Sequence, residues 1–293
     1  MLNSRRVKTM LMNELREKTA LSRKAIEYYE EKGLISPKRD ANNYRLYSEE
    51  ALNRLNRISL YRKLGCSIEE IKGILEDEGN SKLAAIIRER EIKDEIEYKK
   101  TKILKSLLSG ENAETLKEEL EHIDRRENIY ESLCRIFPGY TGQALFIAYK
   151  DFLDEKLKPE NQKYFDLFID FLDNLPALPI SEEEAEIIEK AAQGISVSTL
   201  KQVNADKIKA VEDYDKWLKD NKETIEKYIE YKKSDEYKNN PVIKIQGKIK
   251  AFMQENNYYA TAIPLIRKFS PSYDEYYKKM LKANENLIKH TNL

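Results

Sequence analysis

A helix with signals at both of its ends is predicted by the sequence Ser22-Arg23-Lys24-Ala25-Ile26-Glu27-Tyr28-Tyr29-Glu30-Glu31-Lys32-Gly33-Leu34-Ile35. Ser22 can cap the N-terminus, because its side chain can accept a hydrogen bond from a backbone N–H of the first turn. Gly33 suits the position just past the C-terminus, where a positive φ is common. Residues 10–18 show a shorter helical pattern, and a turn at 19–22 separates the two helices. This arrangement predicts a helix-turn-helix, whose second helix typically enters the major groove of DNA.

Residues 34–47 predict a small β-hairpin after these helices. Tyr44 and Leu46 have strand character, and the Asn42-Asn43 pair marks the turn, because asparagine tolerates the left-handed backbone that hairpin turns need. Such a hairpin beside a helix-turn-helix is a wing. Its basic residues are Lys38, Arg39 and Arg45.

The chain as a whole favours helices over strands. Two more helices are predicted directly after the hairpin, one from Ser48 to Leu64 and one that ends near Glu76 and opens with a capping box formed by Ser67 and Glu70. Only 9 Gly and 8 Pro are spread over 293 residues, too few for the many turns of an all-β protein. We therefore expect a mainly α fold that contains one small hairpin.

Several classes of protein are disfavoured by what the sequence lacks. No stretch approaches 18 apolar residues and no secretory signal is recognisable, so we expect a cytoplasmic protein without contact to a membrane. Cys66 and Cys134 are isolated, which favours structural thiols over metal ligands and over a disulfide framework. There is no glycine-rich phosphate loop and no HExxH or GxSxG motif. We expect no metal, no cofactor and no enzymatic activity.

The charges are unevenly distributed although their sum is zero. The first 75 residues hold 16 Lys and Arg against 10 Asp and Glu, and the remainder holds 36 against 42. A basic first segment joined to an acidic remainder is typical of a DNA-binding domain attached to another domain, because phosphate contacts dominate DNA affinity. Ordinary scatter is the alternative interpretation.

A long charged helix is predicted over residues 81–108. Ile92, Ile96, Ile103 and Leu107 are spaced 4, 7 and 4 apart, which forms a thin apolar seam typical of a two-stranded coiled coil. The alternative is a single solvated helix with charge pairs one turn apart. We therefore predict three segments: a DNA-binding domain at 1–78, a dimerisation helix at 79–110 and a helical effector-binding domain at 111–293.

The third segment is rich in aromatic residues. Aromatic pockets with a few acidic groups suit bulky organic ligands, including aromatic and cationic ones, through stacking and cation–π attraction. The alternative is that the rings fill helix–helix interfaces. The candidate ligand-binding residues are Phe137, Tyr140, Tyr149, Trp217, Tyr258 and Tyr259.

Three blocks of the first segment match a known signature. Residues 22–35 match S-x-x-x-[IL]-R-Y-Y-E-x-x-G-L-[IL], residues 42–47 match N-G-Y-R-x-Y, and residues 64–71 match L-G-F-S-L-E-E-I. The blocks occur in the same order as in the MerR family of bacterial transcriptional regulators. The segment from Leu11 to Leu75 therefore resembles the DNA-binding domain of that family.

The resemblance implies a winged helix-turn-helix protein that works as a homodimer. In that family the two DNA-binding heads are held apart by an antiparallel coiled coil and bind a pseudo-palindromic promoter site. An effector then lets the dimer distort the promoter, so that RNA polymerase can use it. For this chain a small organic effector is the expected ligand. The alternative is a repressor or architectural DNA-binding protein whose C-terminal domain binds another protein.

The resemblance also assigns roles to individual residues. Lys24 falls at a base-contacting position of the recognition helix, with Arg23 as a second candidate, and Tyr28 corresponds to a tyrosine that meets phosphate. Arg45 matches an arginine of the wing, and Arg62 falls where a basic residue of the third helix touches phosphate. The predicted DNA-contacting residues are Ser22, Arg23, Lys24, Tyr28, Arg39, Asn43, Tyr44, Arg45 and Arg62.

Two positions depart from the family pattern. Asn43 replaces the glycine of the hairpin and should be tolerated. Glu27 replaces the usual arginine before the paired tyrosines and brings a carboxylate to the side expected to face DNA. Glu27 either pairs with a neighbour such as Arg23 or Lys24, or removes one phosphate contact.

Overall fold

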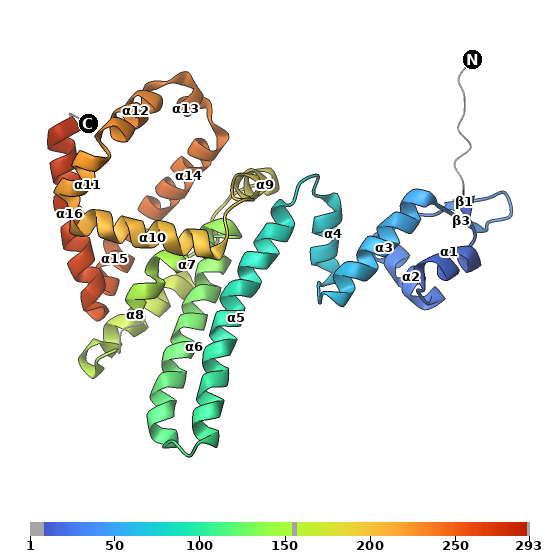
Figure 1. The fold of residues 1–293 in the computed structure, drawn as a ribbon, viewed down its shortest axis with the longest axis horizontal. Coiled ribbons are helices and arrows are strands. Elements are labelled where there is room, and N and C mark those ends of the chain that lie inside the picture. Colours follow the sequence, from blue (N-terminus) through green and yellow to red (C-terminus); the bar gives the residue numbers. More distant parts are fainter. Residues whose placement is uncertain (1–8, 154–156, 292–293) are drawn as a thin grey trace. The chain divides into compact units, whose positions relative to one another are not determined.

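The structure, a computed structural model, describes residues 9–153 and 157–291. The chain divides into two compact units, residues 1–83 and 84–293, which we call the N-terminal and the C-terminal unit. Within the described residues, the strands lie in the N-terminal unit and helices make up nearly all of the remaining regular structure (Figure 1). The fold is mainly α with one small sheet, as predicted from the sequence. No helix in the described ranges is long and apolar enough to cross a membrane.

The N-terminal unit contains four helices and three short strands among its described residues. In chain order they are β1 (Thr9–Met10), α1 (Met12–Thr19), α2 (Arg23–Glu31), β2 (Lys38–Arg39), β3 (Arg45–Ser48), α3 (Glu49–Lys63) and α4 (Ile68–Glu76). The predicted caps are present. The Ser22 hydroxyl accepts a hydrogen bond from the backbone N–H of Ala25, Ser67 and Glu70 form a capping box, and Gly33 has a φ of 71°.

The sheet has three antiparallel strands in the order β1-β3-β2. Arg39 pairs with Arg45 across the predicted hairpin, and Met10 pairs with Tyr47 on the other side of β3. The sequence pattern placed Met10 in the first helix. It lies in a strand instead, because its pairing with Tyr47 buries both side chains. A two-residue strand gives no recognisable alternation, so β1 could not be predicted.

The described part of the C-terminal unit is helical throughout. Helix α5 (Ser81–Leu108) begins in the N-terminal unit and continues into the C-terminal one. The other helices are α6 (Ala113–Ile136), α7 (Tyr140–Leu153), η1 (Pro159–Asn161), α8 (Gln162–Asn174), α9 (Glu182–Ala191), α10 (Val197–Glu212), α11 (Tyr214–Asp220), α12 (Lys222–Lys233), α13 (Asp235–Asn239), α14 (Pro241–Glu255), α15 (Tyr258–Phe269) and α16 (Pro271–Thr291). Figure 1 shows α5 and α6 as an antiparallel hairpin.

Three of the four apolar residues that were predicted to face a second chain are buried within this one. Ile92, Ile96 and Ile103 are at most 7% exposed and belong to the hydrophobic core of the C-terminal unit, whereas Leu107 is 43% exposed. Charged hydrogen bonds also connect α5 to other helices of the C-terminal unit, since Lys150 of α7 and Lys201 of α10 both donate to Glu95 of α5. The three isoleucines are therefore intramolecular core residues. An apolar stripe does not tell which helix covers it, and here helices of the same chain do so.

Candidate nucleic-acid interface

Helix α2 has one side in the core of the N-terminal unit and one side in solvent. Ile26 and Tyr29 are buried, whereas Arg23, Lys24 and Tyr28 are exposed. Among the described residues, Lys24 makes no ion pair. A cationic side chain and a phenol on the solvent side of a helix can reach base edges and phosphates.

The tip of the wing is a tight turn that is held by its own side chains. Asp40 accepts hydrogen bonds from the backbone N–H groups of Asn42 and Tyr44, at 2.9 and 2.8 Å. Asn43 has a φ of 67°, so it adopts the left-handed backbone that was expected of it. Arg39 donates to both the carbonyl and the side-chain oxygen of Asn43. Tyr44 is left 64% exposed at the tip.

Two carboxylates of α2 hold arginines that were predicted to contact DNA. The Nε of Arg45, on β3, donates to Oε1 of Glu30 at 3.1 Å, and its Nη1 lies 3.7 Å from Oε1 of Glu27. The Nε of Arg23 donates to the same Oε1 of Glu27 at 3.0 Å. Glu27 therefore pairs with Arg23, which is one of the two alternatives that the sequence left open. The hydrogen bond from Arg45 to Glu30 fastens the wing to the recognition helix.

The same contacts set the electrostatics of this corner. The hydrogen bond to Glu30 raises the pKa of Arg45, whose guanidinium is charged at neutral pH in any case. Burial raises the pKa of the Tyr47 phenol, which lies fully enclosed beside this cluster, and the nearby Glu30 adds to the effect. The cluster of Arg23, Arg45, Glu27 and Glu30 carries no net charge.

The remaining predicted residues have local structural contacts. The Ser22 hydroxyl is used in capping α2, as described above. Arg62 is exposed on α3, and its Nη1 donates to the carbonyl of Cys66 at 2.6 Å, which steadies the turn between α3 and α4. Cys66 is buried, as expected for a structural thiol.

The predicted DNA-contacting residues thus fall into two groups, one on α2 and one on the wing, which the Arg45–Glu30 hydrogen bond connects. Arg62 lies apart from both groups, on α3. Ser22, Arg23, Lys24 and Tyr28 lie on or next to α2, and Arg39, Asn43, Tyr44 and Arg45 lie on the wing. No role was predicted for Asp40 and Glu30, although both organise the wing. An aspartate just before an Asn-Asn turn is a usable signal for Asp40. No comparable sequence signal exists for Glu30, because it lies 15 residues from its partner Arg45.

In the C-terminal unit, Tyr258 contacts three of the other candidate ligand-binding aromatics, Phe137, Tyr149 and Tyr259, whereas Tyr140 and Trp217 have other neighbours. Phe137 and Tyr258 are core residues, and the hydroxyl of Tyr258 donates to that of Tyr149 at 3.2 Å. Tyr259 is 46% exposed. The ring of Tyr140 packs against the guanidinium of Arg88 at 5.3 Å. Trp217 lies beside Tyr214 on α11, with ring centroids 6.2 Å apart.

A groove on the C-terminal unit lies elsewhere, between α5, α6 and the start of α8. Its apolar residues are Ile103, Ile123, Leu157 and Pro159, and its margin carries acidic and basic side chains that include Lys102 and Glu119. None of the six candidate aromatics lines it. Within the described ranges, no group of three or more His, Cys, Asp or Glu is arranged to hold a metal ion.

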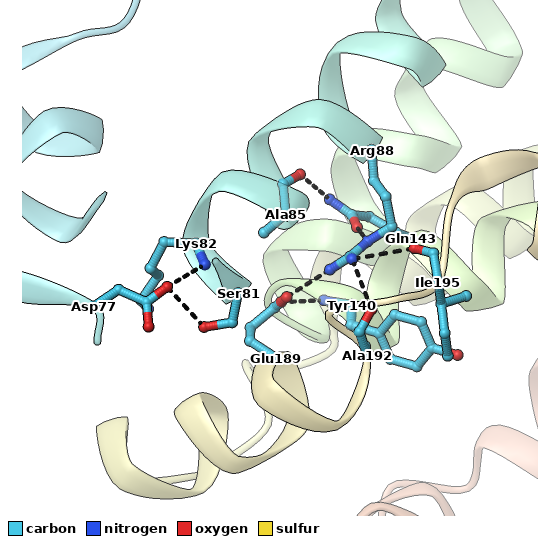
Figure 2. A network of polar contacts seen from close by, with 10 residues as sticks. All are labelled: Asp77, Ser81, Lys82, Ala85, Arg88, Tyr140, Gln143, Glu189, Ala192 and Ile195. Atoms are coloured by element: carbon cyan, nitrogen blue, oxygen red, sulfur yellow. Dashed lines mark hydrogen bonds and ion pairs between the residues drawn. The ribbon is translucent and has the colours of Figure 1, made fainter. Parts of the chain in front are cut away.

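A buried arginine forms the polar centre of the C-terminal unit (Figure 2). Arg88 of α5 is 1% exposed and donates through Nε to Gln143, through Nη1 to the carbonyls of Ala192 and Ile195, and through Nη2 to Glu189. Glu189 in turn accepts from the backbone N–H of Tyr140. Since α5, α7 and the α9–α10 connection all contribute, this cluster joins three distant segments. Nothing in the sequence indicates this cluster, because Arg88 looks like any other charge on a long charged helix.

Comparison with known proteins supports the assignment of the N-terminal unit. Residues 10–78 match the model of the MerR HTH family regulatory proteins. The chain is 42% identical over 62 residues to the HTH-type transcriptional regulator CueR of Salmonella typhimurium, covering 21% of this chain and 45% of CueR. It is 49% identical over 61 residues to a ZntR homolog of Haemophilus influenzae, covering 20% and 45%.

A longer but weaker similarity extends beyond the matched domain. The chain is 28% identical over 142 residues to the HTH-type transcriptional regulator YfmP of Bacillus subtilis, covering 46% of this chain and 92% of YfmP. The chain spans about half the length of the other relatives named above. No solved structure matches the chain.

Proposed function

We propose that this chain, whose residues 10–78 form a MerR-type helix-turn-helix domain, is a DNA-binding transcriptional regulator that acts as a homodimer. The observation that carries the proposal is the match of this domain to relatives that are transcriptional regulators. The exposed side of α2 and the basic wing support it, because together they offer one element for the major groove and one for the adjacent phosphates.

In the proposed complex, α2 contacts base edges and the wing contacts the backbone. Lys24 is the candidate for a base contact, because its ammonium is exposed and makes no ion pair within the described residues. Tyr28, Arg39 and Tyr44 are exposed where phosphates would pass, and Arg62 is a further candidate on α3. Such phosphate contacts set the register and supply most of the salt-dependent affinity.

For the homodimer we propose a side of α5 other than the predicted seam. Tyr98, Leu104 and Leu108 are 70%, 66% and 89% exposed, and they lie away from the buried isoleucines. Leu104 and Leu108 are one helical turn apart and share one exposed side, with Tyr98 further round the helix. Exposed apolar side chains of this kind favour a protein partner, and a second copy of the same helix offers a matching side.

We further propose that the C-terminal unit binds a small organic effector and that binding alters how the dimer distorts promoter DNA, which RNA polymerase then uses. The groove between α5, α6 and α8 supports this, since it combines an apolar floor with a charged margin. An effector can act only by binding one conformation of the dimer more tightly than the other.

The test of DNA binding uses the full chain and two duplexes of equal length. One carries the DNA upstream of its own gene, and the other is a scrambled version. Fluorescence anisotropy from 50 to 300 mM salt should show a steep loss of affinity with salt for both, by about 0.9 log units per log unit of salt for each phosphate contact. The upstream duplex should bind more tightly. A folded chain that binds neither duplex at 50 mM salt would refute the proposal.

A further inference from the structure

Two of the arginines on the DNA-binding side are already engaged by carboxylates of the same domain. Oε1 of Glu27 accepts from Arg23 at 3.0 Å and lies 3.7 Å from Nη1 of Arg45. Arg23 and Glu27 are one helical turn apart on α2, and Arg45 reaches the same oxygen from β3. A single carboxylate oxygen therefore lies between a helix arginine and a wing arginine, and the wing arginine is also held by Glu30 through its Nε.

The contact is open to solvent and can be exchanged. The side chains of Arg23 and Glu27 are 65% and 36% exposed, and that of Arg45 is 31% exposed. An ion pair this exposed contributes little to folding, because water and salt screen it. A phosphate can thus replace Glu27 without disturbing the core. The exchange requires Arg23 to give up its hydrogen bond with Glu27 and Arg45 to turn its Nη1 from the same oxygen while its Nε stays on Glu30. It leaves the Glu27 carboxylate close to the DNA.

We propose that Glu27 competes with DNA phosphates for Arg23 and Arg45 and thereby lowers the affinity of the domain for duplexes of any sequence. This inference rests on the proposed DNA-binding function. Binding to any duplex uses phosphate contacts, so it loses part of the contribution that the two arginines would make. Binding to the true site also uses base contacts, for which Lys24 is the candidate, and these do not depend on Glu27. Glu27 therefore lowers the affinity for all duplexes by a similar factor and leaves the choice between sequences to the base contacts.

The test compares two variants that each remove one negative charge from the exposed side of α2. Glu27→Gln removes the carboxylate that contacts the arginines. Glu31→Gln is the matched control, since Glu31 is exposed one turn further along and makes no ion pair with the described residues. Both should fold as the wild type does, as judged by circular dichroism and melting temperature.

For a scrambled duplex, Glu27→Gln should bind more tightly than wild type and depend more steeply on salt. One regained phosphate contact steepens the slope by about 0.9, which corresponds to about a 3.5-fold change in relative affinity between 50 and 200 mM salt. The preference for the upstream duplex over the scrambled one should stay the same, because both duplexes regain the same phosphate contact. Glu31→Gln should show a clearly smaller change in slope.

A second pair of variants tests whether the arginines mediate the effect. In a background with Arg23→Ala and Arg45→Ala, the change Glu27→Gln should no longer steepen the salt dependence of DNA binding, because Glu27 then has no arginine partner that its removal could free for a phosphate. The inference is overturned if Glu27→Gln behaves as Glu31→Gln does, or if its effect persists in the arginine-free background. A wild-type chain that binds no duplex at all contradicts the proposed function instead, so the two failures can be told apart.

Discussion

Cys134 shows how its surroundings decide whether a potentially reactive side chain can react. It lies on α6 among core residues of the C-terminal unit, and burial raises the pKa of its thiol to about 11, although a hydrogen bond with Tyr130 works in the opposite direction. The thiolate is the nucleophilic form of cysteine, so this thiol is almost entirely inactive at neutral pH.

We therefore predict slow labelling of Cys134 in the folded protein. A Cys66→Ser variant leaves it as the single cysteine of the chain. A disulfide reagent at pH 7.5 should modify this variant far more slowly than the same protein in denaturant, and the rate should keep rising with pH above 9. Equal rates in the folded and denatured states would show that the thiol is neither shielded nor raised in pKa.

Whether a contact between two residues could be predicted depended on how far apart the two residues are in the sequence. The pairing of Glu27 with Arg23 could be anticipated, because residues four apart on a helix are neighbours. The contact of Arg45 with Glu30 joins two elements 15 residues apart, and Arg88 contacts Glu189 across 101 residues. Neither contact leaves a local pattern, so the sequence could predict the arginine of the wing but not the carboxylate that holds it.

Among the elements, α5 begins with a built cap that involves Asp77. One carboxylate oxygen accepts from the backbone N–H of Lys82 and the hydroxyl of Ser81, at 2.9 and 3.0 Å, and the other accepts from the N–H of Gly79 at 3.0 Å. Burial by itself raises the pKa of Asp77, but these hydrogen bonds outweigh it and the pKa is lowered. The charged form is therefore stabilised by folding.

Replacing Asp77 should weaken the start of α5 in a pH-dependent way. A carboxyl whose pKa is lowered by folding adds stability above its unfolded pKa of about 3.9, and that stability is lost as the pH falls through the lower folded value. Asp77→Ala should reduce the free energy of unfolding by about 1 kcal/mol at pH 7 in urea titrations. The difference from wild type should shrink in acid, and the exposed neighbour Glu78→Ala serves as control. A difference that is independent of pH would assign the effect to packing rather than to the charge.

Element types could be predicted better than element partners. Capping residues, hairpin turns and helical periodicity are local, which is why α2, the β2–β3 hairpin and α5 were anticipated. The partner of the apolar stripe on α5 is not local. Ile92, Ile96 and Ile103 fit a coiled-coil seam as well as they fit the core in which they lie.

For the whole molecule, the proposed dimer makes two kinds of substitution on α5 behave differently. Leu104→Lys places a charge on the exposed side proposed for a second copy, so it should give a folded monomer by light scattering and weaken binding to the upstream duplex by about 100-fold or more, because the second head is lost. Ile96→Lys buries a charge in the core of the same chain and should lower the melting temperature instead. A Leu104→Lys protein that remains a dimer would place the interface elsewhere.

The two units also differ in how far the sequence could determine them. In the N-terminal unit, three ordered blocks of residues predicted the helix-turn-helix and the wing. In the C-terminal unit, composition predicted helices but not which aromatic rings would meet. Phe137 and Tyr258, which are distant in the chain, pack against each other in the core, whereas Trp217 packs against Tyr214 of its own helix. A contact between residues distant in the chain leaves no local pattern, so the first pair could not be predicted.

The hydrogen bonds of Arg88 stay within the C-terminal unit, which makes the boundary between residues 83 and 84 suitable for building chimeras. Every partner of Arg88 shown in Figure 2 follows this boundary, and the Asp77 cap with Ser81 and Lys82 precedes it. A graft that exchanges the head while keeping α5 in helical register would sever neither network. Modular recombination of this kind would join the C-terminal unit to a different DNA-binding domain in a single step.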